Sequence, residues 1–360
     1  MKTTLATALA LATIVTACPE HDAAERPAAR QGRQANLLAD YLPYVEYPQA
    51  QTANVTKYVV AARKLAGDDL YAYFARDCIY QPRYVKLDDA AFQSALAPAT
   101  EVFKNFYFVG QAAWSSSAYD TGDGLVIYDT LASSAEIESI VLPGLAKFGF
   151  TGHDIKYVLV SHEHFDHYGG ARYLQQNFGA AVVASADCWK ALEALSPTAN
   201  PAPPVRDAKA ITVTKDATEV KLGNVTTTIY LTPGHTNGTM SYLLPVTDLL
   251  TGDRLLAGMY GGSGASRTAW SLGVQAVSLE RFANIARKNK ASVLLSSHHS
   301  RDRSMYNIEE VALRTCDKQG HKCNLDNPWN VGVDTYYRWL MMESLCIRAQ
   351  AARGGFILSQ

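Results

Sequence analysis

The chain has 360 residues, of which 48% are apolar or aromatic, and a formal net charge of −1 at neutral pH. This length and composition support a sizeable core in one large domain or two small ones. The balanced charge argues against a broad basic surface, so we expect neither nucleic acid nor an anionic membrane surface as a partner.

The first residues have the pattern of an export signal. Lys2 precedes an apolar run over residues 5–17, which is too short to span a bilayer comfortably, and residues 15–17 (Val-Thr-Ala) form an acceptable cleavage site. We therefore predict a signal peptide over 1–17 and a secreted or periplasmic protein. Two alternatives remain: a buried N-terminal helix, or a lipid anchor on Cys18, because the same site resembles a bacterial lipobox. No later stretch is long and apolar enough to predict a membrane span.

Six cysteines follow the predicted cleavage site, as expected for a protein that matures in an oxidising compartment. Cys316 and Cys323 flank a polar, turn-like stretch that a disulfide would close. Cys188 lies in an apolar region, where a buried free thiol is as plausible as a disulfide. Sequence alone does not determine the pairing. The chain contains no Cys-x-x-Cys pair, which argues against a structural zinc knuckle.

The chain after the signal divides into four predicted segments. Residues 18–36 are rich in Ala, Arg and Gln and form a flexible leader, and 37–104 have helical spacing of apolar residues, typical of a lead-in packed on the core. Short runs typical of strands alternate with helical patterns across the core, 105–302, and residues 303–360 form a helical extension. The predicted strands are 105–110, 124–130, 156–161, 180–185, 210–214, 218–223, 225–232, 240–246, 248–253 and 291–297. This alternation favours an α+β fold with helices covering sheets in layers.

The densest cluster of chemically active side chains is the stretch SHEHFDHYGG, which follows the predicted strand 156–161. It places His162, His164, Asp166 and His167 within six residues, on a loop between a strand and a helix. Side chains two residues apart on an extended segment point to the same side, so His162 and His164 can converge. Imidazole nitrogen and carboxylate oxygen are the ligands that zinc and similar divalent metals prefer. A chance match to this pattern is rare, so we predict a metal site.

Two later segments repeat this arrangement of a strand followed by a polar, histidine-bearing loop. His235 stands in LTPGHTNGT after the predicted strand 225–232, and His298 and His299 stand in VLLSSHHS after the last predicted strand. Adjacent side chains on an extended segment point in opposite directions, so only one of this pair is expected to reach the site. The other is expected to point away, as a surface group or a support behind the ligands.

The motif His-x-His-x-Asp-His, followed in order by Gly-His-Thr, Gly-Asp and a final histidine, resembles the metallo-β-lactamase superfamily. His167 and the LLSSH segment are most similar to its subclass B3 neighbourhood. The resemblance spans about residues 105–300 and implies an αββα sandwich with a two-metal site at one edge of the sheets. It implies His162, His164 and His235 on the first metal, and Asp166, His167 and His298 on the second. Asp253 matches the position of a bridging aspartate in many superfamily hydrolases, but B3-like enzymes often carry one that does not bridge, so its ligation stays open.

The resemblance implies two divalent metal ions per chain, with zinc favoured, and hydrolysis of a small-molecule substrate. Metal-bound hydroxide would attack the carbonyl of a cyclic amide or ester, such as a β-lactam, another lactam or a lactone. Asp166 would bind a metal and orient the nucleophile. Hydrolysis of a thioester or phosphodiester is the alternative within enzymes, and a non-catalytic metal-binding protein is the alternative outside them.

The Gly-rich stretch 261–266 is expected to form a mobile loop near the mouth of the site. Tyr260, Arg267 and Trp270 beside it are candidate substrate contacts, although ordinary surface or packing roles are the favoured explanation for all three. The sequence does not indicate an oligomeric state.

Overall fold

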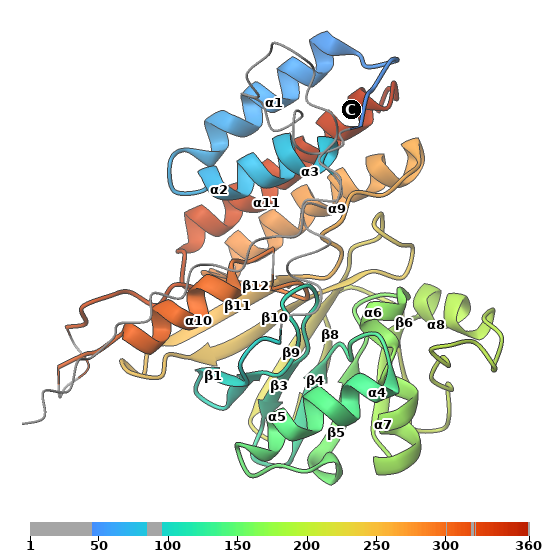
Figure 1. Cartoon of the computed structure of the whole chain (residues 1–360), viewed down its shortest axis with the longest axis vertical. Helices are drawn as coiled ribbons and strands as arrows, with labels where there is room; N and C mark the ends of the chain where they lie inside the picture. The colour runs from blue at the N-terminus through green and yellow to red at the C-terminus, as the bar shows by residue number, and fades with distance from the viewer. Residues whose placement is uncertain (1–44, 85–95, 300, 318–319, 321, 359–360) are drawn as a thin grey trace, which may run out of the picture. The chain divides into compact units, whose positions relative to one another are not determined.

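Two β-sheets lie face to face in the computed structural model, which describes residues 45–84, 96–299, 301–317, 320 and 322–358 (Figure 1). The predicted signal peptide 1–17, the leader 18–36 and Cys18 lie outside these residues. So does the start of the predicted helical lead-in.

The first sheet has seven strands in the spatial order β1 to β7. The strands β1 to β4 are antiparallel, and β4 to β7 run parallel to one another. The strands are β1 (Thr100–Phe103), β2 (Phe106–Phe108), β3 (Ser117–Asp120), β4 (Leu125–Tyr128), β5 (Ile155–Leu159), β6 (Ala181–Ser185) and β7 (Ile211–Val213). The first strand therefore begins at Thr100, inside the range predicted to be a helical lead-in.

The second sheet has five strands in the order β12-β11-β10-β9-β8. The pair β11 and β12 is parallel, whereas the other neighbours are antiparallel. The strands are β8 (Thr218–Leu222), β9 (Val225–Leu231), β10 (Met240–Thr247), β11 (Arg254–Tyr260) and β12 (Val293–Ser296). In β9 the side chains alternate between buried and partly exposed positions, because one face of the sheet packs on the core.

The predicted strand 248–253 is wrong, because these residues form the turn between β10 and β11. The Asp248 carboxylate accepts hydrogen bonds from the backbone N–H groups of Leu250 and Thr251, both at 2.9 Å. Gly252 has a positive φ of 74°. An aspartate that bonds to the backbone two residues on favours a turn over an extended strand.

The main core lies between the two sheets and is rich in aromatic residues. Phe106 and Tyr128 from the first sheet pack in one cluster with Tyr242 and Met259 from the second. The Tyr128 hydroxyl lies 2.6 Å from the Thr227 hydroxyl, so the polar end of this buried ring is satisfied across the sheets.

Helices cover the outer faces of both sheets, which confirms the predicted αββα sandwich (Figure 1). The seven-stranded sheet is covered by α4 (Ser134–Glu136), η3 (Ile137–Val141), α5 (Leu142–Ala146), η4 (Gly152–Asp154), α6 (Phe165–Tyr168), α7 (Ala171–Phe178) and α8 (Ala186–Glu193). The five-stranded sheet is covered chiefly by α1 (Thr52–Ala66), α2 (Tyr71–Phe74), η2 (Ala75–Tyr80), α9 (Ala269–Lys288) and α11 (Val333–Arg353). The short α3 (Gln81–Arg83) follows η2, and α10 (Ser304–Leu313) follows β12.

The N-terminal helices and the long C-terminal helix form one layer. Residues from α1, η2, α9 and α11 share a hydrophobic cluster with the outer side of the second sheet. A disulfide joins Cys78 of η2 to Cys346 of α11. The predicted disulfide between Cys316 and Cys323 is also present, and Cys188 is a buried free thiol. Residues 43–360 thus form one compact unit.

Within the part of the chain that the structure describes, the search for a helix long and apolar enough to cross a membrane finds none.

Candidate metal centre

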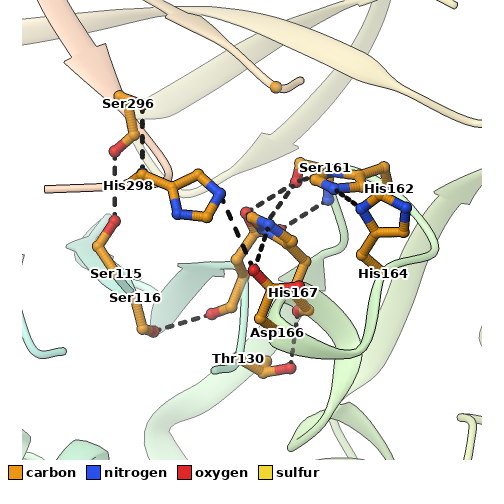
Figure 2. Close-up of polar contacts among 12 residues, drawn as sticks. Ser115, Ser116, Thr130, Ser161, His162, His164, Asp166, His167, Ser296 and His298 are labelled. Carbon is orange, nitrogen blue, oxygen red and sulfur yellow. Dashed lines mark hydrogen bonds and ion pairs between the residues drawn. The ribbon is translucent and has the colours of Figure 1, made fainter. Parts of the chain in front are cut away.

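Six side chains from three segments converge at one edge of the two sheets. His162 and the rest of its motif follow β5, His235 follows β9, and His298 follows β12. Because these strands end at the same edge, segments more than 130 residues apart meet there. Figure 2 shows His298 reaching from the β12 side toward Asp166 and His167, with His162 and His164 beyond them. The structure thus brings together the six side chains that the sequence analysis singled out as ligands.

The first group consists of His162, His164 and His235. The Nε2 atoms of His162 and His235 lie 3.2 Å and 3.1 Å from the Nδ1 atom of His164. Three zinc–nitrogen bonds of about 2.0–2.1 Å in tetrahedral geometry separate the nitrogens by roughly 3.4 Å. The observed separations therefore match the first coordination shell of a metal ion, and the donor set is the one that zinc prefers.

The second group consists of Asp166, His167 and His298. The Asp166 Oδ2 atom lies 3.3 Å from His167 Nε2 and 3.9 Å from His298 Nε2. His167 is fully buried, and its Nε2 has no hydrogen-bond partner among the described residues. A buried nitrogen without a hydrogen bond is costly, and a metal ion would satisfy it.

Hydrogen bonds on the far ring nitrogens fix how three of these imidazoles are turned. The Nδ1–H of His235 donates to the Gly264 carbonyl at 2.7 Å, and that of His298 donates to the Ala113 carbonyl at 2.9 Å. His167 Nδ1 lies 2.7 Å from the Asp129 carboxylate. In each case the Nε2 atom is left for the site, which is how proteins orient histidine ligands toward a metal.

Asp129 is a buried support that the sequence analysis missed. It follows β4 and also accepts hydrogen bonds from the backbone N–H and the hydroxyl of Ser161, at 2.7 and 2.8 Å. It therefore links the end of β4 to the residue just before His162. A polar residue directly after the buried strand sequence LVIY was the available signal.

Burial keeps most of these imidazoles neutral, which is the form that binds metal. Burial, with neighbouring imidazoles, lowers the pKa of His162 well below its usual value and the pKa of His235 to about 3. Burial likewise lowers the pKa of His298 to about 4. His167 differs: burial lowers its pKa, but the carboxylates of Asp129 and Asp166 outweigh burial and raise it to about 10. A metal ion that binds here must displace that proton.

Asp253 does not belong to this centre. It lies in the turn before β11, where Thr251 donates a hydrogen bond to its carboxylate at 2.8 Å. The other end of β11 leads to the loop that contacts His235 through Gly264. The seven residues of β11 therefore separate Asp253 from the histidines. The structure does not support Asp253 as a metal ligand.

The predicted substrate contacts occupy three different environments. Tyr260 is buried in the core and packs on Phe282, so it is not a surface contact in this structure. Arg267 is exposed and lines a cavity of about 500 Å³ together with Ser263 and neighbouring loop residues. Trp270 is exposed at the start of α9 and lines a separate groove.

His299 points away from the centre, as predicted, but it is not a surface residue. Its side chain is fully buried, and its ring lies 4.7 Å from the ring of Phe108. Neither ring nitrogen has a hydrogen-bond partner among the described residues. His299 therefore acts as a core side chain beneath the loop that carries His298.

Two aromatic side chains at the rim of the centre were not anticipated. Phe165 lies between the ligand candidates His164 and Asp166 and is 51% exposed. Trp114 packs edge-on against it at 6.5 Å and follows Ala113, whose carbonyl holds His298. An exposed aromatic inside the motif was visible in the sequence, but its partner lies about fifty residues away.

Comparison with known proteins finds a match to one family model and several solved structures with a similar fold. Residues 112–261 match the family model described as the metallo-beta-lactamase superfamily. The chain resembles BJP-1, a subclass B3 metallo-beta-lactamase of Bradyrhizobium japonicum, with 23% identity, 69% of this chain and 92% of that one covered, and a TM-score of 0.54. It also resembles MIM-1 from Novosphingobium pentaromativorans (23% identity, 71% and 90% covered, TM-score 0.56) and FEZ-1 from Legionella gormanii (19%, 68% and 92%, 0.56). At these identities the likeness establishes the fold.

Proposed function

Because residues 112–261 match the model of the metallo-beta-lactamase superfamily, we propose that the chain is a dinuclear-metal hydrolase that opens a cyclic amide or ester. The observation that carries the proposal is the pair of adjacent three-residue groups, each with its ligand atoms within 4.8 Å of one another. Zinc is the metal that suits a site of five imidazoles and one carboxylate. Fold alone does not choose a substrate, so the site carries the argument.

Bound divalent metals would supply a water of lowered pKa and a Lewis acid for the substrate carbonyl. The chain itself supplies orientation. Asp166 has a carboxylate whose pKa is lowered, mainly by His167 and in spite of burial, so it is an acceptor at neutral pH. We assign it to orient the attacking water, because a single oxygen, Oδ2, lies 3.3 Å from His167 Nε2 and 3.9 Å from His298 Nε2, inside the second group.

The residues of the second group are held rigidly, which bears on how a leaving group would be stabilised. His167 is held from behind by Asp129, and His298 is held by the Ala113 carbonyl, so neither ring can turn without breaking a buried hydrogen bond. A rigid set of ligands would hold the second metal where it could stabilise charge that develops on a departing nitrogen or oxygen. We find no observation that favours a serine or cysteine nucleophile.

The test is a hydrolysis panel of β-lactams, other lactams, lactones, thioesters and phosphodiesters, run with purified protein before and after chelation and after zinc is returned. We expect turnover of a lactam or lactone that chelation abolishes and zinc restores, together with two equivalents of metal by elemental analysis. Turnover of only a thioester or a phosphodiester would move the assignment to another hydrolase class. Binding of metal without turnover of any member of the panel would favour a non-catalytic metal-binding protein.

We also propose that the protein is exported, secreted or periplasmic, with lipid anchoring through Cys18 as the alternative. The two disulfides support this, because disulfides persist in oxidising compartments. N-terminal sequencing and mass measurement of the mature protein separate the cases. A free N-terminus near Cys18 supports secretion, a lipid-modified Cys18 supports anchoring, and an intact Met1 on a cytosolic product contradicts export.

A further inference from the structure

The segment that carries His298 is a short turn after β12, and the Ala113 carbonyl holds the His298 ring while the Ser115 N–H donates to the Ser297 carbonyl at 3.0 Å. The His298 N–H donates to the Ser296 hydroxyl at 3.2 Å, and the Arg301 N–H donates to the His298 carbonyl at 2.8 Å. Whatever holds Arg301 therefore also fixes the backbone of His298. His298 itself lies beyond residues 112–261, the range that matches the superfamily model, and one set of its supports also lies outside that range.

Arg301 is held by Asp77, a residue of the N-terminal helical layer. The Arg301 guanidinium makes a short ion pair with the Asp77 carboxylate, and both side chains are largely buried. Arg76 forms two hydrogen bonds with the same carboxylate, at 3.0 and 2.7 Å, and donates a third to the Arg301 carbonyl at 3.1 Å. Two adjacent residues of η2 thus hold both the side chain and the backbone of Arg301.

Asp77 is in turn anchored to the C-terminal helix. The next residue, Cys78, forms the disulfide with Cys346 of α11, and its carbonyl accepts a hydrogen bond from Arg353 at 2.6 Å. Glu343 lies one helical turn before Cys346 and is buried beside Asp77. Burial and the Asp77 carboxylate raise the pKa of Glu343 well above its usual value, which favours a protonated Glu343 beside the Asp77 carboxylate. The position of Asp77 is therefore determined by covalent and polar contacts to α11.

We propose that Asp77 is a positioning residue for His298: through Arg301 it fixes the turn that presents this imidazole to the second metal group, and the Cys78–Cys346 disulfide keeps Asp77 in place. The inference rests on the proposed metal-binding role of His298. It gives the helical layer a purpose beyond covering the sheet. A residue about 220 positions away in the chain, outside the matched family range, sets the geometry of a ligand.

The structure contains a matched control for this proposal. Asp248 is also a buried aspartate paired with an arginine, because Arg314 Nη1 lies 2.9 and 2.7 Å from its two carboxylate oxygens. It lies in the turn between β10 and β11, at the other end of β11 from the metal centre. Asp77→Asn and Asp248→Asn each remove one charge from a buried aspartate that is paired with arginine, so Asp248→Asn reports general destabilisation away from His298.

The experiment titrates zinc into metal-free wild type, Asp77→Asn and Asp248→Asn, in competition with a chromophoric chelator. Circular dichroism confirms that each protein is folded under the conditions used. We expect Asp77→Asn to weaken the second zinc equivalent by about 10- to 100-fold, the range typical for loss of a residue that orients a ligand, with the first equivalent unchanged. Asp248→Asn should bind both equivalents as wild type does. The absorption spectrum of the cobalt-substituted protein should change only in Asp77→Asn.

The outcomes separate the inference from the proposed function. A wild-type protein that binds no metal overturns both. Two tight equivalents in wild type and unchanged binding in Asp77→Asn, or equal losses in both variants, overturn the positioning role alone. If Asp77→Asn does not fold, Arg301→Lys with Arg314→Lys as its control takes its place, because lysine keeps the charge but loses the planar fork of donors. A selective loss of the second equivalent in Arg301→Lys, and in the double variant Cys78→Ser/Cys346→Ser, supports the proposal, and wild-type binding in Arg301→Lys overturns it.

Discussion

The adjacent histidines after β12 offer a way to separate metal binding from folding. His298 has its ring directed at Asp166 and His167, whereas the ring of His299 lies in the core against Phe108. Replacing each with alanine should therefore have opposite effects. His298→Ala should lose the second metal with only a small loss of stability in the metal-free fold, and His299→Ala should keep both metals and lose more stability.

The magnitudes follow from burial. The His298 side chain is 22% exposed and would lose one hydrogen bond to a carbonyl, which costs about 0.5–1.5 kcal/mol. The His299 side chain is fully buried, and removing a ring of that size from a core costs somewhat less than the ~3–5 kcal/mol of a buried Phe→Ala change. Losing two unpaired ring nitrogens returns ~1–3 kcal/mol. The net loss for His299→Ala is therefore about 2 kcal/mol at the centre of these ranges and less than ~4 kcal/mol at most. His299→Leu should recover it, because leucine restores apolar volume without the buried polar atoms.

The assay combines elemental analysis of metal content with urea unfolding of the metal-free proteins. Metal affinity at the second group should fall by more than about 100-fold in His298→Ala, since a ligand contributes more than an orienting partner does. His299→Leu serves as the control that retains bulk at the neighbouring position. If His299→Ala lost a metal equivalent while His298→Ala kept both, the assignment of the ligand would be wrong by one residue, and the reasoning from alternation along the chain would fail with it.

Three further outcomes are expected. Asp253→Asn should leave the metal content unchanged, whereas Asp166→Asn should reduce it. Elemental analysis measures the metal content of both proteins. If the two variants lost metal equally, the placement of Asp253 outside the metal centre would be contradicted. Phe165→Ala should raise KM about 2- to 10-fold for substrates with an aromatic arm, since an edge-on aromatic contact contributes ~0.5–1.5 kcal/mol. The variant should leave kcat unchanged, and it should leave KM unchanged for analogues with a small acyl group. Equal effects on both sets of substrates would argue against a contact with Phe165. Burial raises the pKa of Asp248 from 3.8, but hydrogen bonds from the Thr251 backbone, Asn327 and Arg314 outweigh it and lower the pKa to about 2. Stabilisation of about 2 kcal/mol, present above pH 3.8, should therefore be lost as pH falls toward 2, and urea unfolding of Asp248→Asn over the same range should lack this dependence.

The layered fold and the ligand candidates were accessible from sequence because each rests on a local pattern. The apolar runs that end at polar loops predicted most strands, and the spacing of His162, His164 and Asp166 carries its own stereochemistry, since alternate side chains share one side of an extended segment. The disulfide between Cys316 and Cys323 was accessible for the same reason, because only a short polar turn separates them. The two-metal centre needed one additional premise, that the strands end at the same edge.

The errors came where a short motif was interpreted without its strand. Gly252 and Asp253 matched a family position in sequence, but Asp248 turns the backbone there and β11 starts only at Arg254, which moves the carboxylate to the wrong end of the strand. Tyr260 seemed a mouth residue because it precedes a glycine-rich loop. It is the last residue of β11, however, and its side chain points into the helical layer. The positions of Asp253 and Tyr260 both depend on which end of β11 faces the metal centre, and the residue types alone do not reveal this.

The contacts that hold the centre were the least accessible, because they join segments with no shared pattern. Asp129 orients His167 from a neighbouring strand, and Asp77 reaches the His298 turn across more than 220 residues. A buried carboxylate that accepts hydrogen bonds from two arginines is costly to assemble unless the surrounding structure fixes all three groups. The Cys78–Cys346 disulfide does this for Asp77 by tying η2 to α11. Residues far outside the superfamily match therefore bear on the geometry of the sixth ligand, and transplanting residues 112–261 alone would omit both that ligand and its support.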